Sequence, residues 1–142
     1  MLIIWTRLRV NLKVKVLNMG EKMNKRKAGS MYEDAACRFL EKNEVKIISR
    51  NFRSRFGEID IVGLKEGILI FFEVKYRSSD KYGTAVEVVG PKKRQVISQV
   101  SDYFRVCFKQ YLNLEVRYDV IAIQKDKLYW IKNAFPYCGK GF

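Results

Sequence analysis

The chain has 142 residues, of which 48% are hydrophobic, enough for one domain with a hydrophobic core. It carries 28 lysines and arginines against 15 acidic residues, a formal charge of +13, which favours a polyanionic partner such as nucleic acid. Solubility is the alternative explanation, but it does not require so large a charge. The absence of histidine excludes a histidine general base and histidine-ligated zinc.

The first 22 residues alternate apolar and basic side chains between Leu8 and Val16, which is typical of a basic amphipathic strand. The segment lacks the uninterrupted apolar core of a signal peptide and is too short and charged to span a membrane. We expect residues 1–22 to be an extension, either poorly ordered or preceding a natural start at Met19 or Met23. Residues 23–142 are expected to form a single domain.

The first predicted helix runs from Met31 to Asn43, after a polar, basic lead-in over Asn24–Ser30. Its apolar side chains form one stripe that would pack on a sheet. Glu33 lies at the edge of this stripe, where its carboxylate can reach a site between helix and sheet. The alternative is that Glu33 only complements the helix dipole in the first turn.

A short strand is predicted over Val45–Ser49, and Arg50–Arg55 is predicted to be a loop. This loop contains three arginines around Phe52, and arginine forks match the geometry of phosphate oxygens. Arg53 and Arg55 are therefore candidates for nucleic-acid contact, with a simple solvated charge run as the alternative.

The most informative stretch is a predicted hairpin from Gly57 to Arg77. Its first strand, residues 58–62, alternates acidic and branched aliphatic side chains, and its second strand, residues 68–76, is apolar and aromatic. Residues two apart share a face of a strand. Glu58 should therefore point the same way as Asp60, and Glu73 the same way as Lys75.

These charged residues at the ends of apolar strands allow two interpretations. Burial of a carboxylate is costly unless it pairs or binds a metal, so a salt bridge or a solvated sheet edge is the plain interpretation. Taken together, Asp60 followed across a hairpin by Glu73-x-Lys75 suits a magnesium nuclease. Divalent cations prefer carboxylate oxygens, and a nearby lysine can orient the attacking water.

The second predicted helix runs from Lys92 to Tyr111, after Gly90-Pro91 and a polar loop over residues 77–83. Lysines at its start, Lys92 and Lys93, oppose the helix dipole, so phosphate contact is a plausible reason for them and a solvated cluster is the alternative. Gln95 and Gln99 lie along one flank of this helix. Strands are predicted over residues 115–124 and 128–131.

The three cysteines, Cys37, Cys107 and Cys138, are far apart and odd in number, which argues against a disulfide framework. Cys37 and Cys107 fall within apolar helical patterns, so we predict that they are reduced core residues. This pattern fits a cytoplasmic protein.

Several short motifs resemble the YraN-like family of uncharacterised bacterial proteins, over roughly residues 23–136. The motifs occur in the family's order and are Tyr32–Ala36, Arg50–Arg53, Gly57–Asp60, Phe72–Arg77, Lys92–Arg94, Arg117–Val120 and Trp130–Phe135. Residues 1–22 depart from the family pattern, as does Ser30-Met31, where a second glycine is expected.

The family is similar to the restriction-endonuclease-like superfamily and, within it, to archaeal Holliday-junction resolvases. The resemblance implies an α/β core with a mixed central sheet flanked by helices. It also implies a site made of an acid on the first helix, an Asp and a Glu-x-Lys, which correspond to Glu33, Asp60, Glu73 and Lys75.

The leading hypothesis is therefore a metal-dependent endonuclease acting on DNA, with branched or recombination intermediates as candidate substrates. Asp60, Glu73, the Val74 carbonyl and Glu33 are the predicted ligands of Mg²⁺ or Mn²⁺, and Lys75 is the predicted catalytic lysine. The predicted backbone contacts are Arg53, Arg55, Arg77, Lys92 and Lys93, and the predicted supporting residues are Glu58, Gln95 and Gln99.

Two other functions compete with this hypothesis. A nuclease-like module that binds nucleic acid without cutting it gains nothing from carboxylates near phosphate. An adaptor whose charge serves a protein partner would bind nucleic acid weakly even at low salt. A resolvase would in addition require a homodimer.

Overall fold

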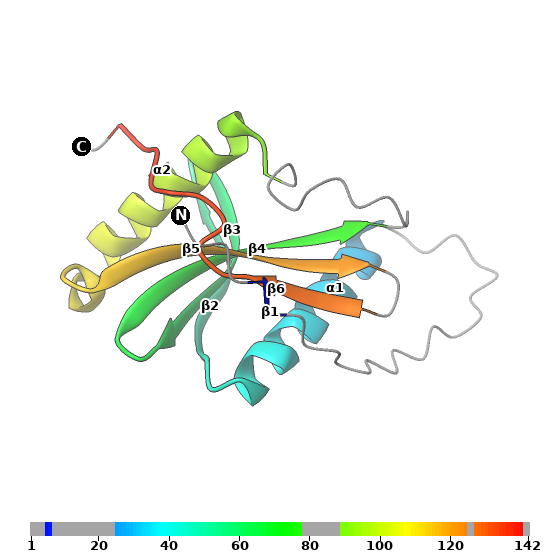
Figure 1. Ribbon diagram of the computed structural model, residues 1–142. Helices are drawn as coiled ribbons and strands as arrows, with labels where there is room; N and C mark the ends of the chain where they lie inside the picture. The colour runs from blue at the N-terminus through cyan, green and yellow to red at the C-terminus, as the bar shows by residue number, and fades with distance from the viewer. Residues whose placement is uncertain (1–4, 7–24, 78–88, 125–126, 141–142) are drawn as a thin grey trace.

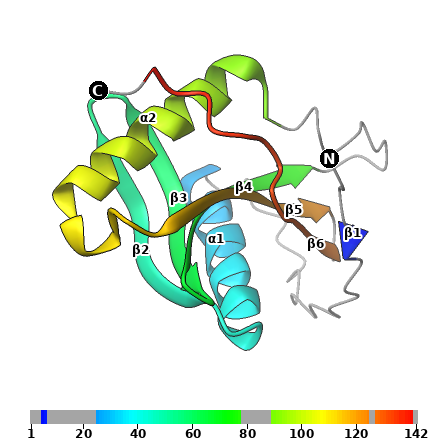
Figure 2. The ribbon, with the colours of Figure 1, turned by 60° about the vertical axis from the view of Figure 1, so that its left-hand side comes forward.

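The computed structural model describes residues 5–6, 25–77, 89–124 and 127–140, which build one sheet between two helices (Figures 1 and 2). The strand order is β1-β6-β5-β4-β3-β2. The elements are β1 (Trp5–Thr6), α1 (Lys25–Lys42), β2 (Lys46–Ser54), β3 (Gly57–Lys65), β4 (Ile68–Arg77), α2 (Pro91–Cys107), a 3-10 turn η2 (Lys109–Tyr111), β5 (Glu115–Gln124) and β6 (Lys127–Ile131).

The sheet is mixed, because β4 and β5 pair in parallel while the other neighbouring strands pair antiparallel. Helix α2 lies between β4 and β5 in the chain, as a parallel connection requires. One hydrophobic core fills the space under α2, around Phe71 and Phe104, and a second lies under α1, around Phe72 and Leu40. The predicted α/β fold with a mixed sheet flanked by helices is confirmed, and the arrangement is that of a restriction-endonuclease-like core.

The predicted elements match the observed ones best in the strands with clear hydrophobic patterns, β4 and β5. Three predicted segments had wrong bounds. The second helix ends at Cys107 and not at Tyr111, because Lys109–Tyr111 form the separate turn η2. Helix α1 begins at Lys25, so most of the predicted lead-in is helical. The predicted loop over Arg50–Arg55 is largely strand, because β2 continues to Ser54 by pairing with β3 as far as Gly57.

The cysteine predictions divide into one confirmed and one wrong. Cys37 is buried against the sheet, as expected. Cys107 is exposed, because α2 ends at that residue and its buried face ends one turn earlier, at Phe104.

The sheet opens into a fork where β3 and β4 separate. The two strands pair only from Lys65–Ile68 to Ile61–Phe72, and beyond this point β3 continues beside β2 alone. Figures 1 and 2 show β2 and β3 curving away from β4 towards α2. We call the space between residues 57–60 of β3 and residues 73–77 of β4 the fork.

The side chains of β3 cease to alternate regularly between the two cores where the fork begins. Ile59 belongs to the core under α2, whereas Ile61 belongs to the core under α1, although residues two apart share a face in a regular strand. Gly57 allows the close approach of this segment to α2, since a Cβ atom there would lie 2.6 Å from Val96 Cγ1. Its φ of 149° also favours glycine.

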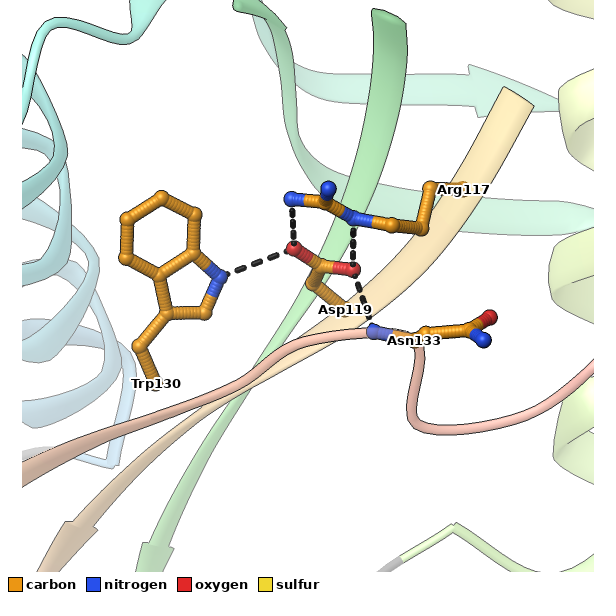
Figure 3. Close-up of polar contacts among 4 residues, drawn as sticks. All are labelled: Arg117, Asp119, Trp130 and Asn133. Carbon is orange, nitrogen blue, oxygen red and sulfur yellow. Dashed lines mark hydrogen bonds and ion pairs between the residues drawn. The ribbon is translucent and has the colours of Figure 1, made fainter. Parts of the chain in front are cut away.

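Asp119 of β5 ties three parts of the chain together (Figure 3). It accepts two hydrogen bonds of 2.9 Å from Arg117, one of 2.8 Å from Trp130 Nε1 on β6 and one of 2.9 Å from the backbone N–H of Asn133. The Asp119 side chain is fully buried. A buried carboxylate with this set of donors is stabilised as an anion and fixes β5, β6 and the turn after β6.

We expect Asp119→Asn to lower the free energy of unfolding by about 3 kcal/mol or more, because it leaves the partly buried Arg117 without its counter-charge. Urea denaturation followed by circular dichroism measures this change. Asp34→Asn is the matched control, since it breaks the exposed Arg50–Asp34 ion pair and should cost about 1 kcal/mol or less. Equal effects of the two substitutions would contradict a structural role for Asp119.

Some predictions fall outside the part of the chain that the structure describes. These are the loop over residues 78–83 and most of the predicted extension over residues 1–22, of which Trp5–Thr6 pair with β6 as β1. The division into an extension and one domain from residue 23 stays a prediction. Within the described residues, no helix has the length and apolar character needed to cross a membrane.

Candidate active site

Asp60 lies at the point where the fork opens and bridges it. Its carboxylate accepts a hydrogen bond of 2.8 Å from the backbone N–H of Val74 on β4. The bond gives the Val74 N–H a partner at a position where β3 and β4 no longer form backbone hydrogen bonds with each other. The N–H and C=O groups of one residue in an antiparallel strand face the same neighbour, so the Val74 carbonyl also opens towards the fork.

Glu73 supplies a second carboxylate beside Asp60, on the α2 side of β4. It is only 5% exposed. Its Oε1 atom lies 3.2 Å from Lys75 Nζ and 3.7 Å from Lys93 Nζ, at the start of α2. Its Oε2 atom is buried and has no hydrogen-bond partner among the described residues, which is unusual for a carboxylate.

The Glu73 carboxylate makes it harder for Asp60 to lose its proton. Burial, which is the largest cause, and repulsion from Glu73 raise the pKa of Asp60 to about 7. The hydrogen bond from Val74 lowers this pKa, while weaker repulsion from Glu33 raises it. Contact with Glu73 raises it further, because the two carboxyls can share a hydrogen bond only while one of them is protonated. Asp60 and Glu73 therefore disfavour carrying two negative charges without a compensating cation.

Among the predicted acids, Glu33 lies close enough to Asp60 to repel its charge across the fork from α1. Glu58, a predicted supporting residue, pairs with Arg53 of β2 at 3.1 Å. Glu58 is therefore part of the surface ladder between β2 and β3.

The predicted backbone-contact residues fall into two groups. Lys92 and Arg77 are exposed at the ends of α2 and β4. Arg53 and Arg55 extend from the β2–β3 hairpin, where Arg55 lies 4.8 Å over the ring of Phe56. Gln95 and Gln99 are half-buried on α2.

Two features of the site were not predicted. Lys93 was expected to contact phosphate, but it reaches Glu73, and the signal was its unfavourable position at a helix N-terminus. The rings of Tyr32 on α1 and Tyr76 on β4 stack with centroids 4.0 Å apart and planes 12° apart. No sequence pattern predicts contact between two tyrosines that lie so far apart along the chain.

The residues in the fork fit a divalent cation by the chemistry of their donors. They offer hard carboxylate and carbonyl oxygens, an unpaired buried oxygen on Glu73, and a pair of carboxyls whose repulsion a cation would relieve. Within the described residues, no group of three or more Asp, Glu or Cys side chains is already arranged around one point. A cation would therefore need the Val74 carbonyl, water or substrate oxygens to complete its shell.

A mixed sheet between two helices, with paired carboxylates and a lysine in a fork of the sheet, defines a restriction-endonuclease-like α/β protein. The chain belongs to uncharacterised protein family UPF0102, whose model matches residues 32–123. This confirms the resemblance to the YraN-like family. The matched region includes the fork, α1 from Tyr32 onwards, all of α2, and β5 except its last residue.

Three relatives illustrate the extent of the similarity. The UPF0102 protein of Fusobacterium nucleatum is 40% identical over 111 residues, covering 78% of this chain and 92% of the relative. That of Francisella tularensis subsp. novicida is 39% identical, covering 75% and 92%. That of Aliivibrio fischeri is 37% identical, covering 82% and 97%. Their names give the family and no activity.

The raised pKa of Asp60 predicts how stability depends on pH. Between its ordinary value of 3.8 and about 7, the folded protein holds a proton that the unfolded chain releases. Asp60 therefore costs no stability below about pH 4, becomes progressively destabilising as the pH rises towards its folded pKa of about 7, and has a constant unfavourable effect above that pH. Asp60→Asn keeps an oxygen for the Val74 N–H but removes the charge.

We expect Asp60→Asn to stabilise the metal-free protein by on the order of a few kcal/mol above pH 7, with the gain shrinking towards pH 4. Urea denaturation in EDTA across this pH range measures the difference from wild type. Glu58→Gln, which removes a carboxylate outside the fork, serves as the control. A difference in the free energy of unfolding that does not vary with pH would show that the pKa of Asp60 is not raised in the folded protein.

Proposed function

We propose that this protein is a metal-dependent endonuclease that cuts DNA at the fork between β3 and β4. The observation that carries the proposal is the buried Glu73 carboxylate, with an unpaired oxygen, beside an Asp60 whose charge is disfavoured. A purely structural salt bridge would satisfy both oxygens, whereas a cation site leaves oxygens unpaired until it is filled.

Asp60, Glu73 and the Val74 carbonyl would hold Mg²⁺ or Mn²⁺, with Glu33 contributing from α1 directly or through water. The bound cation would supply polarisation of the scissile phosphate and a lower pKa for the attacking water. The protein supplies the geometry, because the Val74 N–H holds Asp60 in the fork.

Lys75 is the residue proposed to act on the reacting groups. Its ammonium lies 3.2 Å from Glu73 Oε1 and is about one-third exposed, so it can also face a phosphate in the fork. There it would orient the attacking water and stabilise the negative charge that develops on the phosphate. Arg53, Arg55, Arg77 and Lys92 would hold the nucleic-acid backbone without reading its sequence.

The direct test is cleavage of labelled four-way junction, duplex and single-stranded DNA with Mg²⁺, Mn²⁺ or EDTA. We expect metal-dependent cutting that falls at least about 100-fold in Asp60→Asn, Glu73→Gln and Lys75→Met. Binding of DNA by the first two variants should be unchanged or tighter, because each loses a negative charge. Cutting that persists in EDTA, or in these variants, would contradict the proposal.

A second candidate function is a module that binds nucleic acid without cutting it. It is favoured by the two lysines that neutralise Glu73 and by the lack, within the described residues, of a preformed group of three metal ligands. Under this alternative, wild type binds DNA in a salt-dependent manner and cuts none of the substrates with either metal.

The contact between Lys93 and Glu73 gives a separate prediction about the metal. Lys93 competes with a cation for Glu73, so Lys93→Met should tighten binding of Mn²⁺ in the absence of nucleic acid by roughly tenfold or less. Titration calorimetry measures this affinity. Lys92→Met, which removes the exposed neighbouring charge, should leave it unchanged, and equal effects would argue against competition at Glu73.

The proposal extends to the cellular location and the oligomeric state of the protein. The three cysteines are free thiols in the structure, which suits the reducing cytoplasm. Cutting both strands of a junction would require two such sites, and therefore a homodimer.

A further inference from the structure

We propose that the stacked rings of Tyr32 and Tyr76 form a platform for an unpaired nucleobase, so that the substrate is nucleic acid with single-stranded or displaced bases beside the scissile phosphate. As a statement about the substrate to be cut, this inference rests on the proposed endonuclease function. As a statement about binding, it can be tested without cleavage.

The platform differs from the other aromatic contacts around β4. Phe71 and Phe72 are buried in the two cores, whereas Tyr76 is 42% exposed although it stacks on Tyr32 with ring centroids 4.0 Å apart. Tyr76 lies on the α1 side of β4, as Phe72 and Val74 do. The N-terminal half of α1 therefore supports a tyrosine ring that stays accessible at the end of the strand.

The position of the platform follows from its neighbours in the chain. Tyr32 precedes Glu33 on α1, and Tyr76 lies between Lys75 and Arg77 on β4. Consecutive Cα atoms are about 3.8 Å apart, and successive strand residues point to opposite faces. Lys75 and Tyr76 therefore lie on opposite faces of β4 at the edge that β3 has left. A strand that passes around this edge with a phosphate at Lys75 would place a base on Tyr76.

The chemistry of the rings suits a base next to phosphates. Stacking on an aromatic side chain contributes about 1–3 kcal/mol per base and tolerates any base. It also requires an exposed face of the base, which paired bases inside a duplex do not offer.

The alternative is that the two tyrosines only pack α1 against β4. This alternative predicts that Tyr76 matters for stability but that the protein does not distinguish a base from its absence. The two explanations therefore differ in a property of the ligand, which can be varied while the protein is left unchanged.

The experiment uses the full chain in EDTA and measures binding by fluorescence anisotropy. The probes are a single-stranded oligonucleotide containing 2-aminopurine, the same oligonucleotide with abasic sites in place of its central bases, and a blunt duplex. Wild type should bind the base-containing strand roughly tenfold more tightly than the abasic strand and quench the 2-aminopurine emission. Equal affinity for the two strands would overturn the platform, and this comparison needs no variant.

Substitutions then locate the effect. Tyr76→Leu should lose both the quenching and the preference for bases, whereas Tyr76→Phe should keep both, because the ring does the stacking. Tyr137→Leu is the matched control, since Tyr137 is similarly exposed, at 46%, but lies in the C-terminal segment and donates a hydrogen bond to Asp102. Full base preference in a folded Tyr76→Leu protein would overturn the assignment to this platform.

The outcome is distinguishable from that of the proposed nuclease activity. Base preference that depends on Tyr76, without cutting by wild type, would support the platform and exclude the endonuclease. Metal-dependent cutting lost in Asp60→Asn, without base preference, would support the endonuclease and exclude the platform.

Discussion

The hydrogen bond from the Val74 N–H to the Asp60 carboxylate is the interaction on which the candidate site depends. A strand that leaves its neighbour exposes backbone groups that must find other partners. Here a side chain from the departing strand supplies the partner, and this draws Asp60 against Glu73. The same bond therefore links β3 to β4 at the start of the fork and holds the Asp60 carboxyl near that of Glu73.

This arrangement sets a local charge pattern that opposes the overall one. The chain carries a formal charge of +13, yet the fork holds Asp60 and Glu73, with Glu33 nearby. The acidic pair is compensated at Glu73 by Lys75 and Lys93, which are both partly exposed. Ion pairs of partly exposed lysines are weak. When a cation binds Glu73, the two lysines can therefore leave it and pair with a phosphate instead. Cation binding and nucleic-acid binding would then favour each other.

Much of the fold could be predicted from hydrophobic periodicity, and the irregular parts could not. The apolar run of β4 located Glu73 and Lys75 on one strand, and the predicted strand over residues 115–124 has the bounds of β5. The fork was missed because the alternation rule assumes a regular strand, which fails between Ile59 and Ile61.

Long-range contacts account for the rest of what the sequence did not reveal. The Arg50–Arg55 stretch was interpreted as a loop from its charge, but an edge strand can carry charged side chains because one edge faces solvent. The stacking of Tyr32 on Tyr76 and the contact of Lys93 with Glu73 join residues from different elements. Only the register of the folded sheet and the direction of α1 and α2 bring such residues together.

The buried Asp119 network matters to the site because of where β4 loses its support. Residues 73–77 of β4 have no ladder to β3, so their ladder to β5, from Glu73–Val120 to Arg77–Gln124, is what keeps them extended. Asp119 faces Phe72, one residue before Glu73, and holds β5 to β6 and to the turn beyond it. A rigid β5 is therefore the condition for a fixed Glu73 and Lys75, since these residues occupy the half of β4 that only β5 supports.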